Sequence, residues 1–386
     1  MHLKQLNALN ENLMNTLVKK RMVIKEIITV LEAFAPPALQ ESYDNAGLIT
    51  GMADWQCTGV LVALDCTEAV ITEAVNNGCN MIVTHHPIIF KGLKKINGHH
   101  YVERTIIAAI KNDIAIYAIH TNVDNVLQGV NKMIANKIGL TNCKPLLAKT
   151  GDLKKLELFV PPSYLGVVRE ALFSAGAGNI GNYSECGFSS EGDGSFLPGL
   201  NSNPVTGVIG ERAKLIETKL EVLYFRWQEK SILQAMKKAH PYEEVAHNVF
   251  SLTNSVSAFG TGLVGHLPAS MRSEDLLVLL KKAFGTSVIR HTALLNREIK
   301  QIAVCGGAGS FLIGNALSEG VDAFITADLK YHDFFEADNK ILLADIGHYE
   351  SEQYTIELIR DILTEKFPNF AVLKTGHNTN PVHYFC

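Results

Sequence analysis

Two adjacent histidines, His85 and His86, end a short apolar run and are followed directly by Pro87. Neighbouring side chains on a strand point to opposite faces, so regular strand geometry does not let both rings bind one ion. Pro87 favours a strand that has just ended, which would leave each ring free to serve a different ion. Taken alone, the pair could equally be two polar residues that cap a strand.

Asp124 and the pair His348 and Glu352 are the other residues suited to metal chemistry. Asp124 follows the next apolar run along the chain, although an aspartate in such a turn is more often a helix cap. His348 and Glu352 are four residues apart, so at a helix start they share a face and could bind one ion together. Gly347 gives the backbone freedom to bring the ring close, although an ordinary exposed helix shows the same spacing.

Imidazole and carboxylate are ligands that zinc, manganese and iron accept. Five such residues are too few for two closed sites, but they suffice for two open sites if a carboxylate bridges the ions and water completes each shell. A bound ion lowers the pKa of water from about 15.7 to about 7, and two ions can share a hydroxide. No Ser–His–Asp or Cys–His group competes as the nucleophile, so the sequence predicts metal-dependent hydrolysis at His85, His86, Asp124, His348 and Glu352.

Strands that alternate with helices must position these residues. The segments 60–139 and 302–367 both show the order strand, helix, strand, helix, strand, helix. This order predicts mainly parallel sheets covered on both faces. In both segments the histidine and charged residues come just after a strand, at the edge where open α/β sheets bind ligands. Two such edges that face each other would form one cleft.

A different segment separates residues 60–139 from residues 302–367. Its order of strand, helix, strand, strand, helix, strand is typical of a ferredoxin-like domain. It has few clustered ligand-type residues, which favours a regulatory or assembly role. The predicted organisation is an N-terminal extension over 1–21 before an alternative start at Met22, a first lobe over 22–150, an inserted domain over 151–255 and a second lobe over 256–386.

Composition excludes several classes of protein. The 386 residues are 47% hydrophobic and 19% charged, which predicts two or three domains with real cores. A net charge of −4 argues against a nucleic-acid partner. Seven cysteines without a CxxC pair argue against a disulfide framework and suit the cytoplasm. No run reaches the roughly 18 apolar residues of a membrane span, so no membrane partner is expected.

Six short motifs occur in the order found in the NIF3 family, also called the GTP cyclohydrolase 1 type 2 or YbgI/YqfO-like family: DNAGL, VTHHPIIF, HTNVDN, CGGAGS, TADLKYH and IGHYESE. The match covers about residues 22–380 and resembles the longer members, whose insert looks like the PII/CutA-type fold. The resemblance implies an α/β fold of two related lobes with an inserted ferredoxin-like domain. It also implies a homohexameric, toroid-like assembly with two divalent metal ions per subunit, for which zinc is the first expectation and manganese or iron the alternatives.

The family's ligands map onto this chain residue by residue. His85 and His86 match the paired histidines, Asp124 the aspartate after the next strand, and His348 and Glu352 the late pair, with Glu352 as the bridge.

Three further residues are candidates for catalysis. His120 could orient ligands, and Lys330 and His332 lie in TADLKYH, where Lys330 could meet a phosphate. A salt-bridged strand end would show the same pattern. The glycines of CGGAGS could bind an anion through their amides, or could simply allow tight packing.

Three functions remain open at this point. The resemblance implies GTP cyclohydrolase-like chemistry, in which metal-bound hydroxide attacks a nucleotide such as GTP and a nearby histidine carries a proton. A phosphoesterase acting on small phosphorylated substrates fits the same ligands, because paired metals suit in-line displacement. The third function is a ring-shaped metal-binding regulator or scaffold without catalysis.

Overall fold

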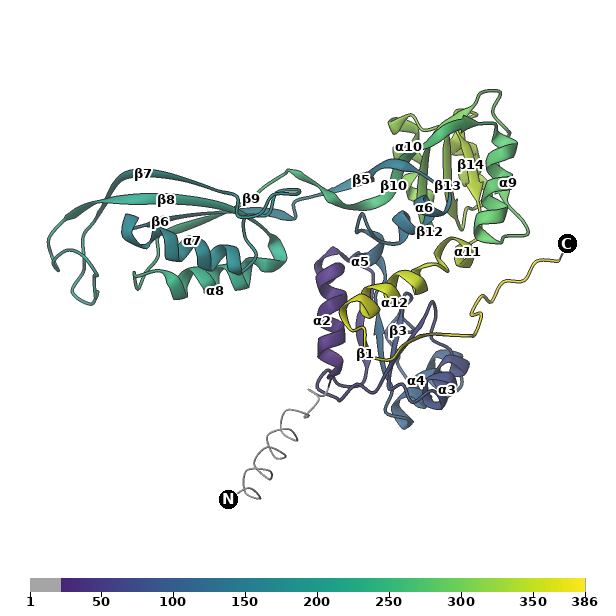
Figure 1. The fold of residues 1–386 in the computed structure, drawn as a ribbon, viewed down its shortest axis with the longest axis horizontal. Helices are drawn as coiled ribbons and strands as arrows, with labels where there is room; N and C mark the ends of the chain where they lie inside the picture. Colours follow the sequence, from purple (N-terminus) through teal and green to yellow (C-terminus); the bar gives the residue numbers. More distant parts are fainter. Residues whose placement is uncertain (1–21, 386) are drawn as a thin grey trace, which may run out of the picture. The chain divides into compact units, whose positions relative to one another are not determined.

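The computed structural model describes residues 22–385, so the predicted N-terminal extension lies outside the described residues. The described chain forms two compact units (Figure 1). One unit joins the residues up to Leu147 with those from Thr261 onward, and the other is Ala148–Gly260. No helix in the described part is long and apolar enough to span a membrane.

The first sheet of the larger unit has five strands in the order β1-β4-β3-β2-β15. The strands β4, β3, β2 and β15 run parallel, and β1 pairs antiparallel at the edge. Every residue of β2, β3 and β4 is buried, which explains why these segments are continuous apolar runs. The bounds are β1 Gly47–Thr50, β2 Val60–Ala63, β3 Met81–Thr84, β4 Ala115–Ala118 and β15 Val372–Lys374.

Helices cover both faces of this sheet (Figure 1). On one face Leu61, Ile82 and Ile116 of the strands form a core with α3 (Glu68–Asn76) and α4 (Tyr101–Lys111). On the other, α12 (Thr355–Lys366) contacts β2, β15 and α2 (Ile24–Phe34). The alternation of side chains along each strand supplies the two apolar faces.

The second sheet has six strands in the order β11-β14-β13-β12-β10-β5. The strands β12, β13 and β14 run parallel, whereas β10 and β11 pair antiparallel to their neighbours. Ala303, Phe324 and Leu343 pack against α10 (Ile313–Glu319). The bounds are β5 Thr141–Thr150, β10 Ser255–Met271, β11 Arg290–His291, β12 Ile299–Ala308, β13 Ala323–Ala327 and β14 Leu342–Asp345. In both sheets three consecutive parallel strands are neighbours, which is the repeated order expected for 60–139 and 302–367.

Two edge strands each belong to the sheet of the other predicted lobe, where the lobes were expected over 22–150 and 256–386. β5 lies at the edge of the second sheet, and β15 pairs with β2 in the first. An edge strand satisfies exposed backbone groups of whichever sheet it reaches, and its position in the sequence does not reveal that choice. The C-terminal segment therefore returns to the first sheet.

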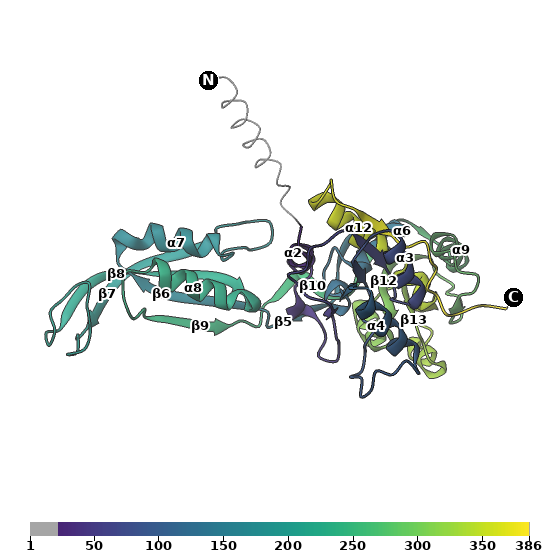
Figure 2. The ribbon, with the colours of Figure 1, turned by 90° about the horizontal axis from the view of Figure 1, so that it is seen from below.

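The smaller unit is an antiparallel sheet in the order β7-β8-β6-β9 with two helices on one face (Figures 1 and 2). Along the chain the order is β6–α7–β7–β8–α8–β9, as the sequence predicts. Leu158 and Leu220 of the sheet share a core with Val168 and Ile232 of the helices. The bounds are β6 Leu153–Val160, α7 Leu165–Ser174, β7 Gly187–Phe196, β8 Ala213–Phe225, α8 Glu229–Ala239 and β9 His247–Ser251.

Candidate metal centre

The five predicted ligand residues meet at the carboxyl ends of the parallel strands of the two sheets. His85 and His86 directly follow β3, and Asp124 ends a short helix after β4, α5 (Thr121–Asp124). His348 and Glu352 are the first and last residues of α11 (His348–Glu352), which follows β14. Each lies where a buried strand ends, which is the edge that the sequence indicates.

Distances between side chains show how closely these residues gather. The Nε2 atom of His85 lies 3.7 Å from both Asp124 Oδ1 and Glu352 Oε1. The Nε2 atom of His86 lies 2.9 Å from Glu352 Oε2 and 3.2 Å from His348 Nε2. The Oε1 atom of Glu352 thus faces His85 and its Oε2 atom faces His86, and the Glu352 side chain is only 4% exposed.

His120 also belongs to this cluster. Its ring centroid lies 5.2 Å from that of His85 and 5.4 Å from that of His86. The described residues contain two groups with the ligand atoms to hold an ion, and they share His86: His85, His86 and His120; and His86, His348 and Glu352. The ring predicted as an orienting or catalytic group therefore lies beside the predicted ligands.

All four histidines have the Nδ1 atom paired with an oxygen, which leaves Nε2 for the centre. A carboxylate or carbonyl partner on the second ring nitrogen is characteristic of metal-binding histidines, because it fixes the tautomer and the ring orientation. The pairs are His85 with the Ile119 carbonyl at 3.0 Å, and His86 with Asp65, His120 with Asp44 and His348 with Asp328, each at 2.7 Å.

Two buried polar atoms in the cluster have no hydrogen-bond partner among the described residues, namely His85 Nε2 and Asp124 Oδ1. The His85 side chain is completely buried, and that of Asp124 is 23% exposed although its Oδ1 atom is buried. Buried polar groups are nearly always paired, since an unpaired one costs about 1–3 kcal/mol. A divalent cation would give both atoms a partner, and imidazole with carboxylate is a donor set that zinc, manganese and iron accept.

The glycines of β12 make room for Glu352. Gly307 has a φ of +59°, and a Cβ atom there would lie 2.4 Å from Glu352 Oε1. The amides of Gly306 and Gly307 donate to Asn131 Oδ1 and Ser351 Oγ, each at 3.0 Å. These two amides are already paired, so the packing alternative fits the structure at Gly306 and Gly307.

The carboxylates of the cluster differ in their electrostatics. Burial alone would raise the pKa of Glu352, but the charges of His348 and His85 hold it well below its usual range. Burial and the charge of Glu352 raise the pKa of Asp124. Two anions close together in a buried site repel each other, and added positive charge between them would relieve this repulsion.

Two histidines of the cluster bind protons tightly when no cation is present. Burial would lower the pKa of His86, but hydrogen bonds with Asp65 and Glu352 raise it to about 9. Burial would also lower the pKa of His348, but the charge of Glu352 and the hydrogen bond with Asp328 raise it to about 11. Below these values both rings carry a proton that a cation must displace.

Lys330 and His332 lie outside this cluster. Both are exposed, and Lys330 directly precedes η5 (Tyr331–Ala337), on which the His332 ring contacts Tyr331 and Phe335. Within residues 22–385 no hydrogen bond or ion pair joins either side chain to the five ligand candidates. Their catalytic roles stay predictions.

Asp65 is a supporting residue that the sequence reasoning missed. It follows β2 at the same edge of the sheet at which His85 follows β3. The signal was present, because a charged residue directly after a buried strand is the pattern that singled out the histidine pair. Asp44 pairs with His120 and also accepts from the Thr121 amide at 3.1 Å.

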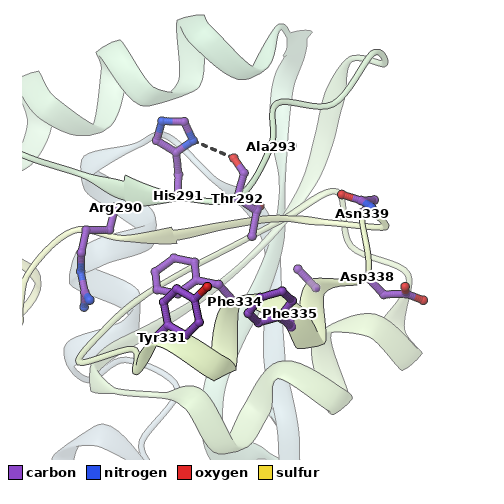
Figure 3. Close-up of a pocket in the computed structure, with 10 residues that line it drawn as sticks. Arg290, His291, Thr292, Ala293, Tyr331, Phe334, Phe335, Asp338 and Asn339 are labelled. Carbon is purple, nitrogen blue, oxygen red and sulfur yellow. Dashed lines mark hydrogen bonds between the residues drawn. The ribbon is translucent and has the colours of Figure 1, made fainter.

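A cavity of about 710 Å³ opens between β11 and η5 (Figure 3). The rings of Tyr331, Phe334 and Phe335 group on one side of it (Figure 3). Arg290 in its wall donates to the Leu329 carbonyl at 2.8 Å and to the carboxylate of Asp345. Asp345 in turn accepts from the Gly347 amide at 3.1 Å. Hydrogen bonds therefore link Arg290 in the wall of the cavity to Gly347, the residue before His348. None of the five ligand candidates lines this cavity.

Two mixed sheets, whose parallel strands share a histidine–carboxylate cluster at their carboxyl ends, define a two-lobed α/β protein with a candidate metal centre. The family model of Duf34/NIF3 (NGG1p interacting factor 3) matches residues 22–381, and the chain belongs to this family.

Named relatives and solved structures agree with this assignment. The chain is 37% identical over 360 residues to the GTP cyclohydrolase 1 type 2 homolog of Halalkalibacterium halodurans, a match that covers 92% of this chain and 97% of the relative. It is similar to the crystal structure of a Bacillus cereus protein related to NIF3, with a TM-score of 0.84 and 34% identity over 95% of this chain and 100% of that one. A Staphylococcus aureus protein gives a TM-score of 0.76 and 30% identity over the same shares.

Replacing Gly307 with alanine should destabilise the protein, because the new Cβ meets Glu352 and the left-handed backbone disfavours a side chain. We expect the free energy of unfolding to fall by about 1–3 kcal/mol in urea denaturation. Gly314→Ala is the matched control, since that glycine lies in α10 and a Cβ atom there would meet nothing within 4 Å. Equal stabilities of the two variants would contradict the close fit around Glu352.

Zinc binding should release protons and strengthen as the pH rises from 6 to 8. His86 and His348 are protonated in this range, with pKa values of about 9 and about 11, so cation and proton compete for the same nitrogen atoms. Isothermal titration calorimetry in buffers of different ionisation enthalpy measures the released protons. An affinity that stays constant or falls with pH would count against these rings as ligands.

Proposed function

We propose that this protein is a dinuclear-metal-dependent hydrolase that acts on a small nucleotide such as GTP. The observation that carries the proposal is the pair of buried, unpartnered atoms, His85 Nε2 and Asp124 Oδ1, that face each other within the histidine cluster. The name of the relatives, GTP cyclohydrolase 1 type 2 homolog, supports a nucleotide as the substrate.

The distances support two sets of proposed ligands that share Glu352. His85, Asp124 and the Oε1 atom of Glu352 would hold one cation. His86, His348 and the Oε2 atom of Glu352 would hold the other. Zinc is the first expectation for this donor set, with manganese or iron as alternatives. When bound, such cations act as Lewis acids and lower the pKa of coordinated water toward 7.

His120 is the side chain best placed to handle a proton. Its Nδ1 atom is fixed by Asp44, and its ring lies beside His85 and His86 with 14% of the side chain exposed. A histidine whose other nitrogen is held by a carboxylate keeps one tautomer, which suits a general base or acid. His120 would therefore accept a proton at Nε2 from the attacking water and pass it to the leaving group.

The smaller unit supports the proposed ferredoxin-like insert. The chain order β6–α7–β7–β8–α8–β9 with the spatial order β7-β8-β6-β9 is that of a split βαβ domain. We propose that it serves regulation or assembly, since the candidate metal ligands lie in the other unit. A homohexameric ring and a cytoplasmic location stay predictions.

A substrate panel separates the candidate functions. Purified protein with quantified metal is offered GTP and a series of phosphodiesters, and His85→Ala and Glu352→Ala are compared with His99→Ala, a histidine variant in an exposed loop. We expect turnover of GTP to fall more than about 100-fold in the first two variants, with loss of metal, because each removes a ligand. The His99 variant should behave like wild type.

Other outcomes would redirect the assignment. Cleavage of diesters without turnover of GTP would favour a phosphoesterase. Bound metal without any turnover would favour a regulator or scaffold. Unchanged metal content in Glu352→Ala would contradict the bridging role.

A further inference from the structure

The C-terminal segment after β15 lies along the supporting residues of the metal centre. The pairing of β15 with β2 continues past Lys374, because the Thr375 amide donates to the Val62 carbonyl at 2.9 Å. The next amide, that of Gly376, donates to Glu73 Oε1 at 2.8 Å. These bonds direct the chain across the carboxyl end of β2, where Asp65 is located.

Thr379 in this segment contacts the aspartate that holds His86. Its hydroxyl donates to Asp65 Oδ2 at 2.8 Å. The other oxygen of the same carboxylate, Oδ1, lies 2.7 Å from His86 Nδ1. The opposite nitrogen of the His86 ring faces Glu352 Oε2 at 2.9 Å. A continuous row of hydrogen-bonded groups therefore runs from the C-terminal segment to the centre of the cluster.

The following residue contacts the helix that carries the other ligands. Asn380 Nδ2 donates to Glu350 Oε1 at 3.1 Å, and Glu350 is a buried residue of α11. The second oxygen of Glu350 lies so close to Gly347 that a Cβ there would be 2.2 Å away. Thr379 and Asn380, which are adjacent in the C-terminal segment, thus contact Asp65 after β2 and Glu350 in α11.

A carboxylate can rotate about its terminal bond, and one hydrogen bond does not fix its plane. A second bond at the other oxygen does, so the Thr379 hydroxyl determines where Asp65 Oδ1 meets the His86 ring. Groups of this kind, which orient a ligand without touching the ion, affect metal affinity. We propose that Thr379 is a positioning residue of the metal centre, acting through Asp65 on His86; the inference rests on the proposed metal-binding function.

Three variants test this role. Thr379→Val removes the hydroxyl at nearly constant shape, and Thr379→Ser keeps it. Thr364→Val is the matched control, since the Thr364 hydroxyl bonds the Arg360 carbonyl within its own helix, α12. Zinc affinity is measured on the full chain by competition with a chelator. We expect the valine variant to bind roughly 2- to 12-fold more weakly, as for the loss of one hydrogen bond, and the serine and control variants to match wild type.

A spectroscopic measurement separates positioning from general destabilisation. With cobalt(II) in place of zinc, the visible absorption bands report the geometry of the ligands, and they should shift in Thr379→Val but not in Thr364→Val. Equal affinity and spectra of Thr379→Val and wild type would overturn the inference, as would a serine variant as weak as the valine variant. Wild-type protein that binds neither zinc nor cobalt would overturn the metal-binding proposal itself, and this inference with it.

Discussion

The buried carboxylate of Glu352 is the group on which the rest of the structure depends. It lies within 3.7 Å of imidazole nitrogens from His85, His86 and His348, two of which follow a strand of the first sheet and one a strand of the second. A carboxylate removed from water requires compensating positive charge and hydrogen bonds. The same group therefore joins the two lobes, excludes any side chain at Gly307 and sets the protonation of its neighbours.

The repeated strand order gives a physical reason for this convergence. Parallel strands bring all their carboxyl ends to one edge, and every ligand candidate lies just beyond such an end. The strands themselves are buried on both faces, whereas the residues after them can adopt the geometry that an ion needs. Carboxylates outside the cluster, such as Asp65 and Asp328, then fix the rings from behind. The orientation of the His86 and His348 rings thus depends on residues that would not contact an ion.

Much of this arrangement could be predicted from the sequence because it follows local rules. Apolar runs followed by His85, His86 and Asp124 indicate strand ends, and the spacing of His348 and Glu352 indicates one helix face. The partners of edge strands could not be predicted, since β15 pairs with a strand about 310 residues earlier through backbone groups that every residue has. The contact between Thr379 and Asp65 could not be predicted from the sequence either, because it depends on where β15 pairs. Membership of a motif, as for Lys330 and His332, does not reveal where a side chain points.

Anomalous diffraction from crystals of the zinc-loaded protein, recorded on both sides of the zinc absorption edge, would locate the bound ions relative to Glu352. We expect two peaks on either side of the Glu352 carboxylate, about 3.5–4 Å apart. One should lie about 2.0–2.2 Å from His85 and Asp124, and the other at the same distance from His86 and His348. A map without peaks between these side chains, or with ions bound only elsewhere, would contradict this expectation.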